Sequence, residues 1–109
     1  MPSRRKSRQQ LEEIKGLVAK GAFHFSGKVY RLLEEGRFQI EDIERCMATA
    51  TEIQKKEVDE LNVAVDGWKY TILGHDTDGY PFYTCGKIIA DENENQLYFF
   101  ITAHENETD

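Results

Sequence analysis

The stretch GHDTDGYPFYTCGK, residues 74–87, combines a histidine, two aspartates in a D-x-D-G pattern, two tyrosines, a cysteine and a lysine. A calcium loop of the EF-hand type would need further oxygen ligands after its glycine and a glutamate at position 12. Counted from Asp76, position 12 is Lys87, and the residues between them are typical of a strand. Asp78-Gly79 is instead typical of a hairpin turn, because glycine readily adopts a positive φ. We therefore expect a turn at this place and no metal site.

Two side chains after this turn could take part in chemistry. Tyr83 and Lys87 are four residues apart, so an unbroken strand places both on one face, while Phe82 and Thr84 point the other way. In metal-free phosphoryl chemistry, a lysine stabilises the charge on the phosphorane while tyrosine or histidine moves protons. The same pattern is also typical of the solvent-facing side of a two-layer sheet. Both interpretations stay open.

The three histidines of the chain differ in their sequence context. His104 follows the most apolar strand, where a polar side chain reaches the rim of the sheet and can meet Tyr83 and Lys87. The alternative for His104 is a frayed chain end. His75 is expected to flank the turn, and His24, between two phenylalanines, is expected to be half-buried and structural.

The spacing of apolar residues predicts the elements that must position these side chains. A helical period predicts three helices, over residues 8–21, 27–36 and 38–50, with a short extended piece at 22–25. An alternating pattern then predicts strands, over residues 51–60, 66–74, 81–91 and 96–104. The expected fold is α+β with two layers, in which N-terminal helices pack on a C-terminal antiparallel sheet of three or four strands.

The 109 residues fit a single domain. We expect it to divide into a basic tail, a helical half, an antiparallel sheet and a short second tail: residues 1–8, 9–50, 51–104 and 105–109. No apolar run reaches the ~18 residues of a membrane span, and the N-terminus lacks the apolar core of a secretory signal. Cys46 and Cys85 are far apart and form no C-x-x-C pair, as expected for two free thiols in a cytoplasmic protein.

Charge is distributed unevenly along the chain. Residues 1–31 carry a net charge of +6 and the remainder −12, which gives −6 overall. A basic first third on an acidic body indicates an anionic partner or a self-complementary contact, and a solubilising tail is an equally good explanation. The acidic total argues against strong nonspecific binding to nucleic acid.

Short motifs in a fixed order resemble those of a bacterial family of small domains allied to the RelE and MqsR ribonuclease toxins. They are an F-x-F-S entry to a helix, an I-E-D-I-E helix, a Y-x-I-x-G…D-G-x-P-F hairpin and a final F-I-T-A-x-E strand, and they span about residues 23–105. The resemblance implies a small α+β fold whose sheet cradles RNA. It also implies metal-independent cleavage of mRNA and neutralisation by a cognate antitoxin, often one with a zinc finger.

Carried over by position, the catalytic cleft of MqsR-like toxins falls on four residues of this chain: Lys56, Lys69, Tyr83 and His104. At His104 the position matches but the residue type does not, because the relative has lysine there. The chain also departs from the family at Ser26-Gly27-Lys28, where many members carry a histidine, and its net charge of −6 differs from the usual basic charge of such toxins.

The leading hypothesis is a cytoplasmic RNA-cleaving domain of a toxin–antitoxin pair that needs no cofactor. His104 or Tyr83 would move protons, and Lys56, Lys69 or Lys87 would stabilise the phosphorane. The partners would be RNA and the antitoxin protein. The alternative is a catalytically silent module that binds another protein through its sheet or its basic N-terminal segment.

Overall fold

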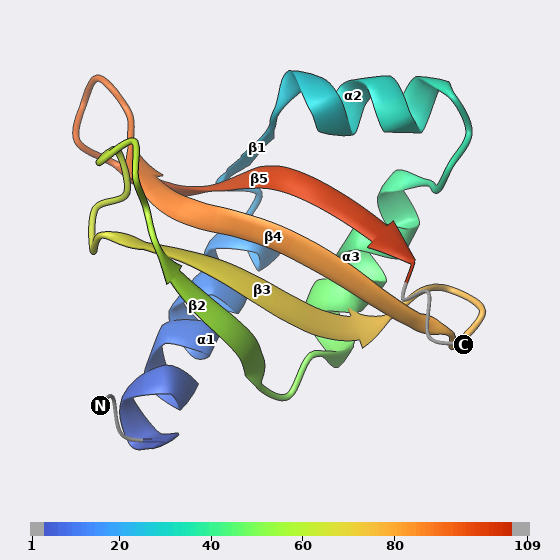
Figure 1. Ribbon diagram of the computed structural model, residues 1–109, viewed down its shortest axis with the longest axis horizontal. Helices are drawn as coiled ribbons and strands as arrows, with labels where there is room; N and C mark the ends of the chain where they lie inside the picture. The colour runs from blue at the N-terminus through green and yellow to red at the C-terminus, as the bar shows by residue number, and fades with distance from the viewer. Residues whose placement is uncertain (1–3, 106–109) are drawn as a thin grey trace.

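The computed structural model describes residues 4–105 as three helices and one five-stranded sheet. The elements in chain order are α1 (Arg4–Ala19), β1 (Phe23–Phe25), α2 (Gly27–Glu34), α3 (Ile40–Thr49), β2 (Ile53–Val58), β3 (Trp68–His75), β4 (Pro81–Ala90) and β5 (Gln96–Glu105). The strands lie in the order β1-β5-β4-β3-β2 (Figure 1). Within residues 4–105, no helix has the length and hydrophobicity that crossing a bilayer requires.

The α+β class is confirmed, but the expected sheet was wrong in two respects. It has five strands, and it is mixed, because β1 pairs in parallel with β5 while the other neighbours are antiparallel. The helices also do not all precede the sheet, since β1 lies between α1 and α2. The added strand has a physical cause: Phe23 and Phe25 pack their rings against Phe100 of the core.

One face of the sheet carries the core. Apolar side chains of α1 and α3 pack there on aromatic and aliphatic side chains of the strands, and the most buried of them are Leu11, Ile14, Ile43, Met47, Tyr70, Ile72, Phe82, Tyr98 and Phe100. Figure 1 shows α1 and α3 behind the sheet and α2 beyond its β1–β5 edge. The opposite face, which we call the open face, is covered by no helix of residues 4–105.

The edge of the sheet at β5 is only half paired. β1 ends at Phe25, opposite Phe100, because Ser26 then starts α2. The Ser26 hydroxyl accepts the N–H of Val29, 3.2 Å away, and donates to the carbonyl of Ile101 at 2.7 Å. Ile101 is an extra residue in β5, since Cys85 pairs with Thr102 and the next residue of β4 pairs with Phe100. In the described chain, no strand lies beside the second half of β5 on this side.

Strand β3 touches helix α3 at Gly74. A Cβ atom at this position would lie 2.0 Å from the backbone carbonyl oxygen of Cys46, so only glycine allows the contact. We expect Gly74→Ala to lower the free energy of unfolding by roughly 3 kcal/mol or more, since two backbones must separate. Urea denaturation measures this change. Gly16→Ala in α1 is the control: its Cβ would meet nothing within 4 Å, and we expect a gain of about 0.5–1 kcal/mol. Equal effects of the two substitutions would contradict the close approach.

The hydroxyl of Tyr98 is buried without a hydrogen-bond partner among the described residues. The hydroxyl of Tyr70, also in the core, donates to the carboxylate of Asp66. Because an unsatisfied buried hydroxyl costs free energy, we expect Tyr98→Phe to leave stability unchanged or raise it by about 1 kcal/mol. Tyr70→Phe should lower it by about 1–2 kcal/mol. Chemical denaturation of both variants tests this difference, and a clear loss of stability in Tyr98→Phe would contradict it.

Candidate functional site

Tyr83 and His104 form a cross-strand pair on the open face. They lie directly opposite each other in the β4–β5 register, and their ring centroids are 5.2 Å apart. Nδ1 of His104 is 2.9 Å from the backbone carbonyl oxygen of Glu105. A carbonyl oxygen can only accept, so Nδ1 carries the hydrogen in this contact and Nε2 of the neutral ring is left as a proton acceptor. The two proton-moving residues expected from the sequence are therefore brought together.

A groove of about 310 Å³ lies next to His104, along the unpaired half of β5. Its walls come from α2, from the connection between α2 and α3 and from the end of β5: Lys28, Leu32, Arg37, Phe38, Thr102, Ala103, His104 and Glu105. Lys28 and Arg37 are exposed and bring two positive charges to the groove, to which Glu105 adds a negative one. Nε of Arg37 also lies 3.3 Å from Oε1 of Glu35 in an exposed ion pair, which leaves the rest of the guanidinium available to a ligand. An imidazole beside two cations suits an anionic ligand such as a phosphate group.

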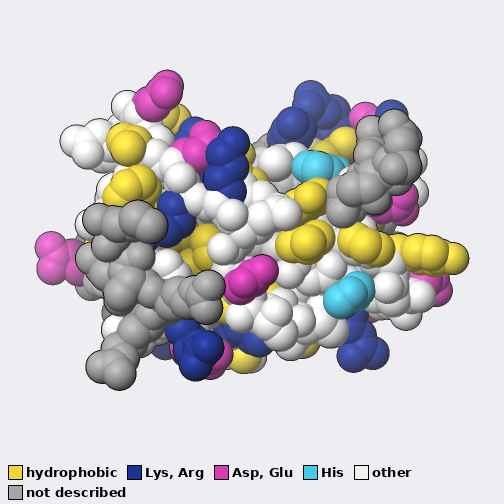
Figure 2. Space-filling view, turned by 60° about the horizontal axis from the view of Figure 1, so that its bottom comes forward, with side chains coloured by type: hydrophobic (Ala, Val, Ile, Leu, Met, Phe, Trp, Pro, Cys, Tyr) yellow, Lys and Arg dark blue, Asp and Glu magenta, His cyan; other side chains and the backbone are white. Residues whose placement is uncertain are grey.

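Sequence reasoning missed Lys28 and Arg37. Both lie in polar surface segments, and no motif or spacing links them to His104, which is more than sixty residues away in the chain. They reach the groove because Ser26 fixes the start of α2 to β5. In the view of Figure 2, histidine side chains lie beside a group of hydrophobic side chains toward the right.

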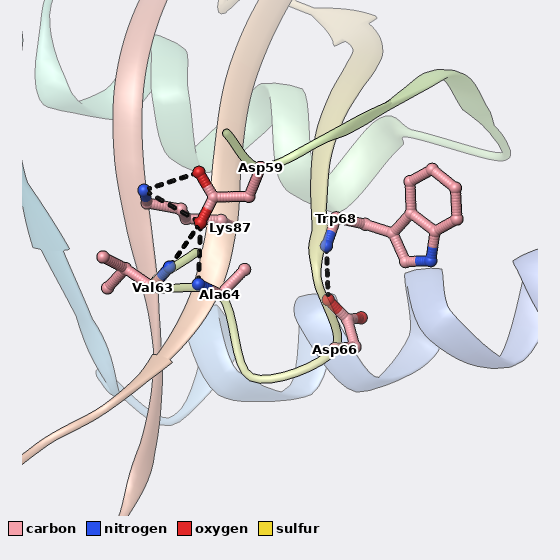
Figure 3. A network of polar contacts seen from close by, with 6 residues as sticks. All are labelled: Asp59, Val63, Ala64, Asp66, Trp68 and Lys87. Carbon is pink, nitrogen blue, oxygen red and sulfur yellow. Dashed lines mark hydrogen bonds and ion pairs between the residues drawn. The ribbon is translucent and has the colours of Figure 1, made fainter. Parts of the chain in front are cut away.

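Lys87 lies on the expected strand but its charge is neutralised. Its side chain is buried, and its Nζ is 3.2 Å and 3.3 Å from the two carboxylate oxygens of Asp59 (Figure 3). Asp59 also accepts the backbone N–H groups of Val63 and Ala64, at 2.9 Å and 2.7 Å. The N–H of Ala64 is the main cause that lowers the pKa of Asp59 to about 2, with the Val63 N–H and Lys87 acting in the same direction. Lys87 thus holds the β2–β3 connection and is not free to meet a substrate.

Lys56 lies on the opposite face of the sheet from the Tyr83–His104 pair. Its Nζ is 4.7 Å from the centre of the Trp68 ring and 3.0 Å from Oε1 of Gln10 in α1. The cation therefore packs between the helix layer and the sheet, where it stabilises the contact of α1 with β2. It cannot act in one site with His104.

Lys69 shares the open face with Tyr83 but is separated from it. In the register of β3 and β4, Tyr83 pairs with Leu73, four residues along β3 from Lys69. At about 3.4 Å per residue this places the Cα atoms of Lys69 and Tyr83 roughly 14 Å apart. Lys69 pairs instead with Glu57 of β2. The structure thus brings together Tyr83 and His104 and leaves Lys56, Lys69 and Lys87 outside their reach.

The D-x-D-G stretch forms the turn between β3 and β4, as expected. The Oδ1 atom of Asp76 accepts the backbone N–H groups of Asp78 and Tyr80, each at 2.9 Å, and Gly79 has a φ of 86°. His75 is exposed beside this turn. No group of three or more His, Cys, Asp and Glu side chains within residues 4–105 has an arrangement that could hold a metal ion.

Both thiols lie in surroundings that keep them protonated. Burial raises the pKa of Cys46 to about 11, and burial also raises the pKa of Cys85. A thiolate is the nucleophilic form of cysteine, so neither residue has the character of a catalytic nucleophile at neutral pH.

Comparison of the chain with protein-family models, with curated proteins and with solved structures finds no match. The resemblance to the RelE and MqsR toxins stays a prediction.

The buried contact of Lys87 with Asp59 predicts a pH-dependent stability. An aspartate in an unfolded chain has a pKa of about 3.9. In the folded protein the pKa of Asp59 is about 2. The carboxylate therefore stabilises the fold fully above about pH 4, and this stabilisation is lost as the pH falls toward 2. In Asp59→Asn the amide leaves Lys87 buried without its counter-charge, so we expect the thermal midpoint at pH 7 to fall by roughly 10 °C.

Thermal unfolding of wild type and Asp59→Asn between pH 2 and pH 7 provides the measurement. The gap between their midpoints should be largest above pH 4 and should narrow toward pH 2. Glu57→Gln is the matched control, because Glu57 is exposed beside Lys55, and its midpoint should follow that of the wild type. A gap that does not vary with pH would argue against an ionised Asp59.

Proposed function

We propose that this protein is a metal-independent endoribonuclease, the toxin-like half of a bacterial toxin–antitoxin pair, with His104 and Tyr83 as its proton-moving residues. The single observation that supports this most is that His104, paired with Tyr83 across the strands, lines a groove that also carries Lys28 and Arg37. The proposed partner in the cytoplasm is a cognate antitoxin protein, and the proposed substrate is RNA.

The positive charges of Lys28 and Arg37 in the groove explain how an acidic protein could still bind RNA. The net charge is −6, which repels a polyanion at long range, but a phosphate group in contact with two cations experiences the local charge most strongly. Lys28 and Arg37 would take the role first assigned to Lys56, Lys69 and Lys87. An arginine is well suited to it because its planar guanidinium forms paired hydrogen bonds with phosphate oxygens.

In the proposed reaction, the imidazole of His104 acts as the base and the hydroxyl of Tyr83 as the acid. The 2′-oxygen of a ribose attacks the adjacent phosphorus while its proton passes to Nε2 of His104. The bond between phosphorus and the 5′-oxygen breaks, and that oxygen takes the proton of the Tyr83 hydroxyl. The products are a 2′,3′-cyclic phosphate and a 5′-hydroxyl, and a proton returned from the imidazolium to the phenolate restores the site. Lys28 and Arg37 stabilise the negative charge of the phosphorane.

Single-turnover cleavage of a labelled single-stranded RNA, with excess protein and with a chelator present, tests the proposal. Because a positioned acid or base contributes roughly 10²–10⁴-fold to the rate, His104→Ala and Tyr83→Phe should each slow cleavage by that order. Lys28→Ala and Arg37→Ala should slow it by roughly 10-fold or more. The product should carry a 2′,3′-cyclic phosphate.

The controls are His75→Ala, which removes an exposed histidine beside the turn, and Lys69→Ala, which removes a cation of the open face outside the groove. Both should cleave at the wild-type rate. RNA left intact by the wild-type protein, or equal rates for wild type and His104→Ala, would overturn the proposal.

A further inference from the structure

Three aliphatic side chains project into solvent from the connection between β2 and β3. Leu61 is 77% exposed, Val63 54% and Val65 50%. Between them, Ala64 turns inward and is buried. We call these three residues the aliphatic knob. No helix or strand of residues 4–105 covers them.

The aliphatic knob is held in place by the Asp59 carboxylate. Asp59 accepts the N–H groups of Val63 and Ala64, and its buried contact with Lys87 ties the connection to β4. The N–H of Val65 also donates to the carbonyl of Ile88 at 2.8 Å. The apolar side chains are therefore displayed from a fixed backbone, which lowers the entropy that a partner must overcome on binding.

The surroundings of the aliphatic knob are acidic. The β4–β5 turn lies beside it at the same end of the sheet, as Figure 1 shows. Five exposed carboxylates belong to these two connections: Glu60, Asp66, Asp91, Glu92 and Glu94. Residues 59–68 and 90–98 contain no lysine, arginine or histidine. These two connections thus combine exposed apolar groups with negative charge and contribute no positive charge of their own.

We propose that the aliphatic knob and its acidic rim form a docking surface for a cationic amphipathic segment of a partner protein, with aliphatic residues on one face and Lys or Arg beside them. Charge complementarity selects this occupant. An RNA strand or an anionic membrane surface would be repelled by five carboxylates. The docking surface lies near the start of β5, whereas the Tyr83–His104 pair lies at the end of this strand. A partner can therefore bind the docking surface without blocking the candidate site, and this binding would be a function separate from the proposed ribonuclease activity.

Selection of binders from a displayed library of random 16-residue peptides tests the proposal. Wild-type protein is the bait, and the Leu61→Ser/Val63→Ser variant is used to remove peptides that bind elsewhere. We expect the enriched peptides to share aliphatic residues at helical spacing and a positive net charge. Their affinity for Leu61→Ser/Val63→Ser should be at least 10-fold weaker than for the wild type, and should also fall with rising salt.

A charge variant, Glu60→Gln/Glu92→Gln, should weaken the same peptides without removing any apolar contact, and it provides the test if the serine variant fails to fold. Ile40→Ser is the matched control, because Ile40 is an exposed aliphatic residue, 44% exposed, at the start of α3. It should bind like the wild type.

The proposal is overturned if enriched peptides are acidic or neutral, if they bind both variants as tightly as the wild type, or if none is enriched. Sedimentation of the free protein provides a further outcome. A dimer that is lost in Leu61→Ser/Val63→Ser would identify a second copy of the chain as the occupant and would also overturn it. None of these results depends on RNA cleavage, so a failure of the ribonuclease proposal is distinguishable from a failure of this one.

Discussion

The hydroxyl of Ser26 makes the contact on which the candidate site depends. It accepts an N–H of the first turn of α2 and donates to the carbonyl of Ile101, so it joins the start of a helix to the middle of a strand. The chain can therefore not continue β1 along β5. α2 is set beside the second half of β5 instead, and this arrangement leaves a groove where a full strand would have left none.

A second buried contact organises the other end of the sheet. The pair of Lys87 and Asp59 costs desolvation of two charges, and such a cost is tolerated where the geometry and further hydrogen bonds compensate for it. Here the compensation comes from two backbone N–H groups of the same connection. The two ends of the sheet therefore differ in character: the groove with Lys28 and Arg37 lies beside the end of β5, and the acidic, apolar connections lie at the opposite end.

Local patterns were sufficient to predict the helices, the four longer strands and the β3–β4 turn. Each of these depends on neighbours within a few residues: periodic apolar side chains, a capping serine, or a glycine that accepts a positive φ. β1 was not predicted as part of the sheet, because three residues carry no periodicity and its partner lies about 75 residues away. The parallel pairing is accompanied by the packing of Phe23 and Phe25 on Phe100, a contact between residues far apart in the chain.

The candidate site was predicted in part, for the same reason. Tyr83 and His104 were expected to meet because His104 follows the last strand, at the rim of the sheet that Tyr83 can also reach. The burial of Lys87 was not foreseen, since it requires a carboxylate 28 residues earlier in the chain. Lys56 turned to the helix side because the irregular pairing between Ile53 and Lys55 breaks the alternation of β2. Lys28 and Arg37 enter the groove through tertiary packing alone.

The extra residue at Ile101 determines which chemistry the end of β5 presents. Phe100 faces the core, and strict alternation from there would direct residue 104 inward and residue 103 outward. With one residue inserted, Ala103 is buried and His104 is exposed. If β5 paired without this extra residue and its sequence were unchanged, the imidazole would point into the hydrophobic core and the methyl group of Ala103 would lie on the open face. The candidate site thus depends on the pairing register of β5 as well as on the identity of its side chains, and a shift of that register by one residue would exchange His104 for its neighbour on the open face.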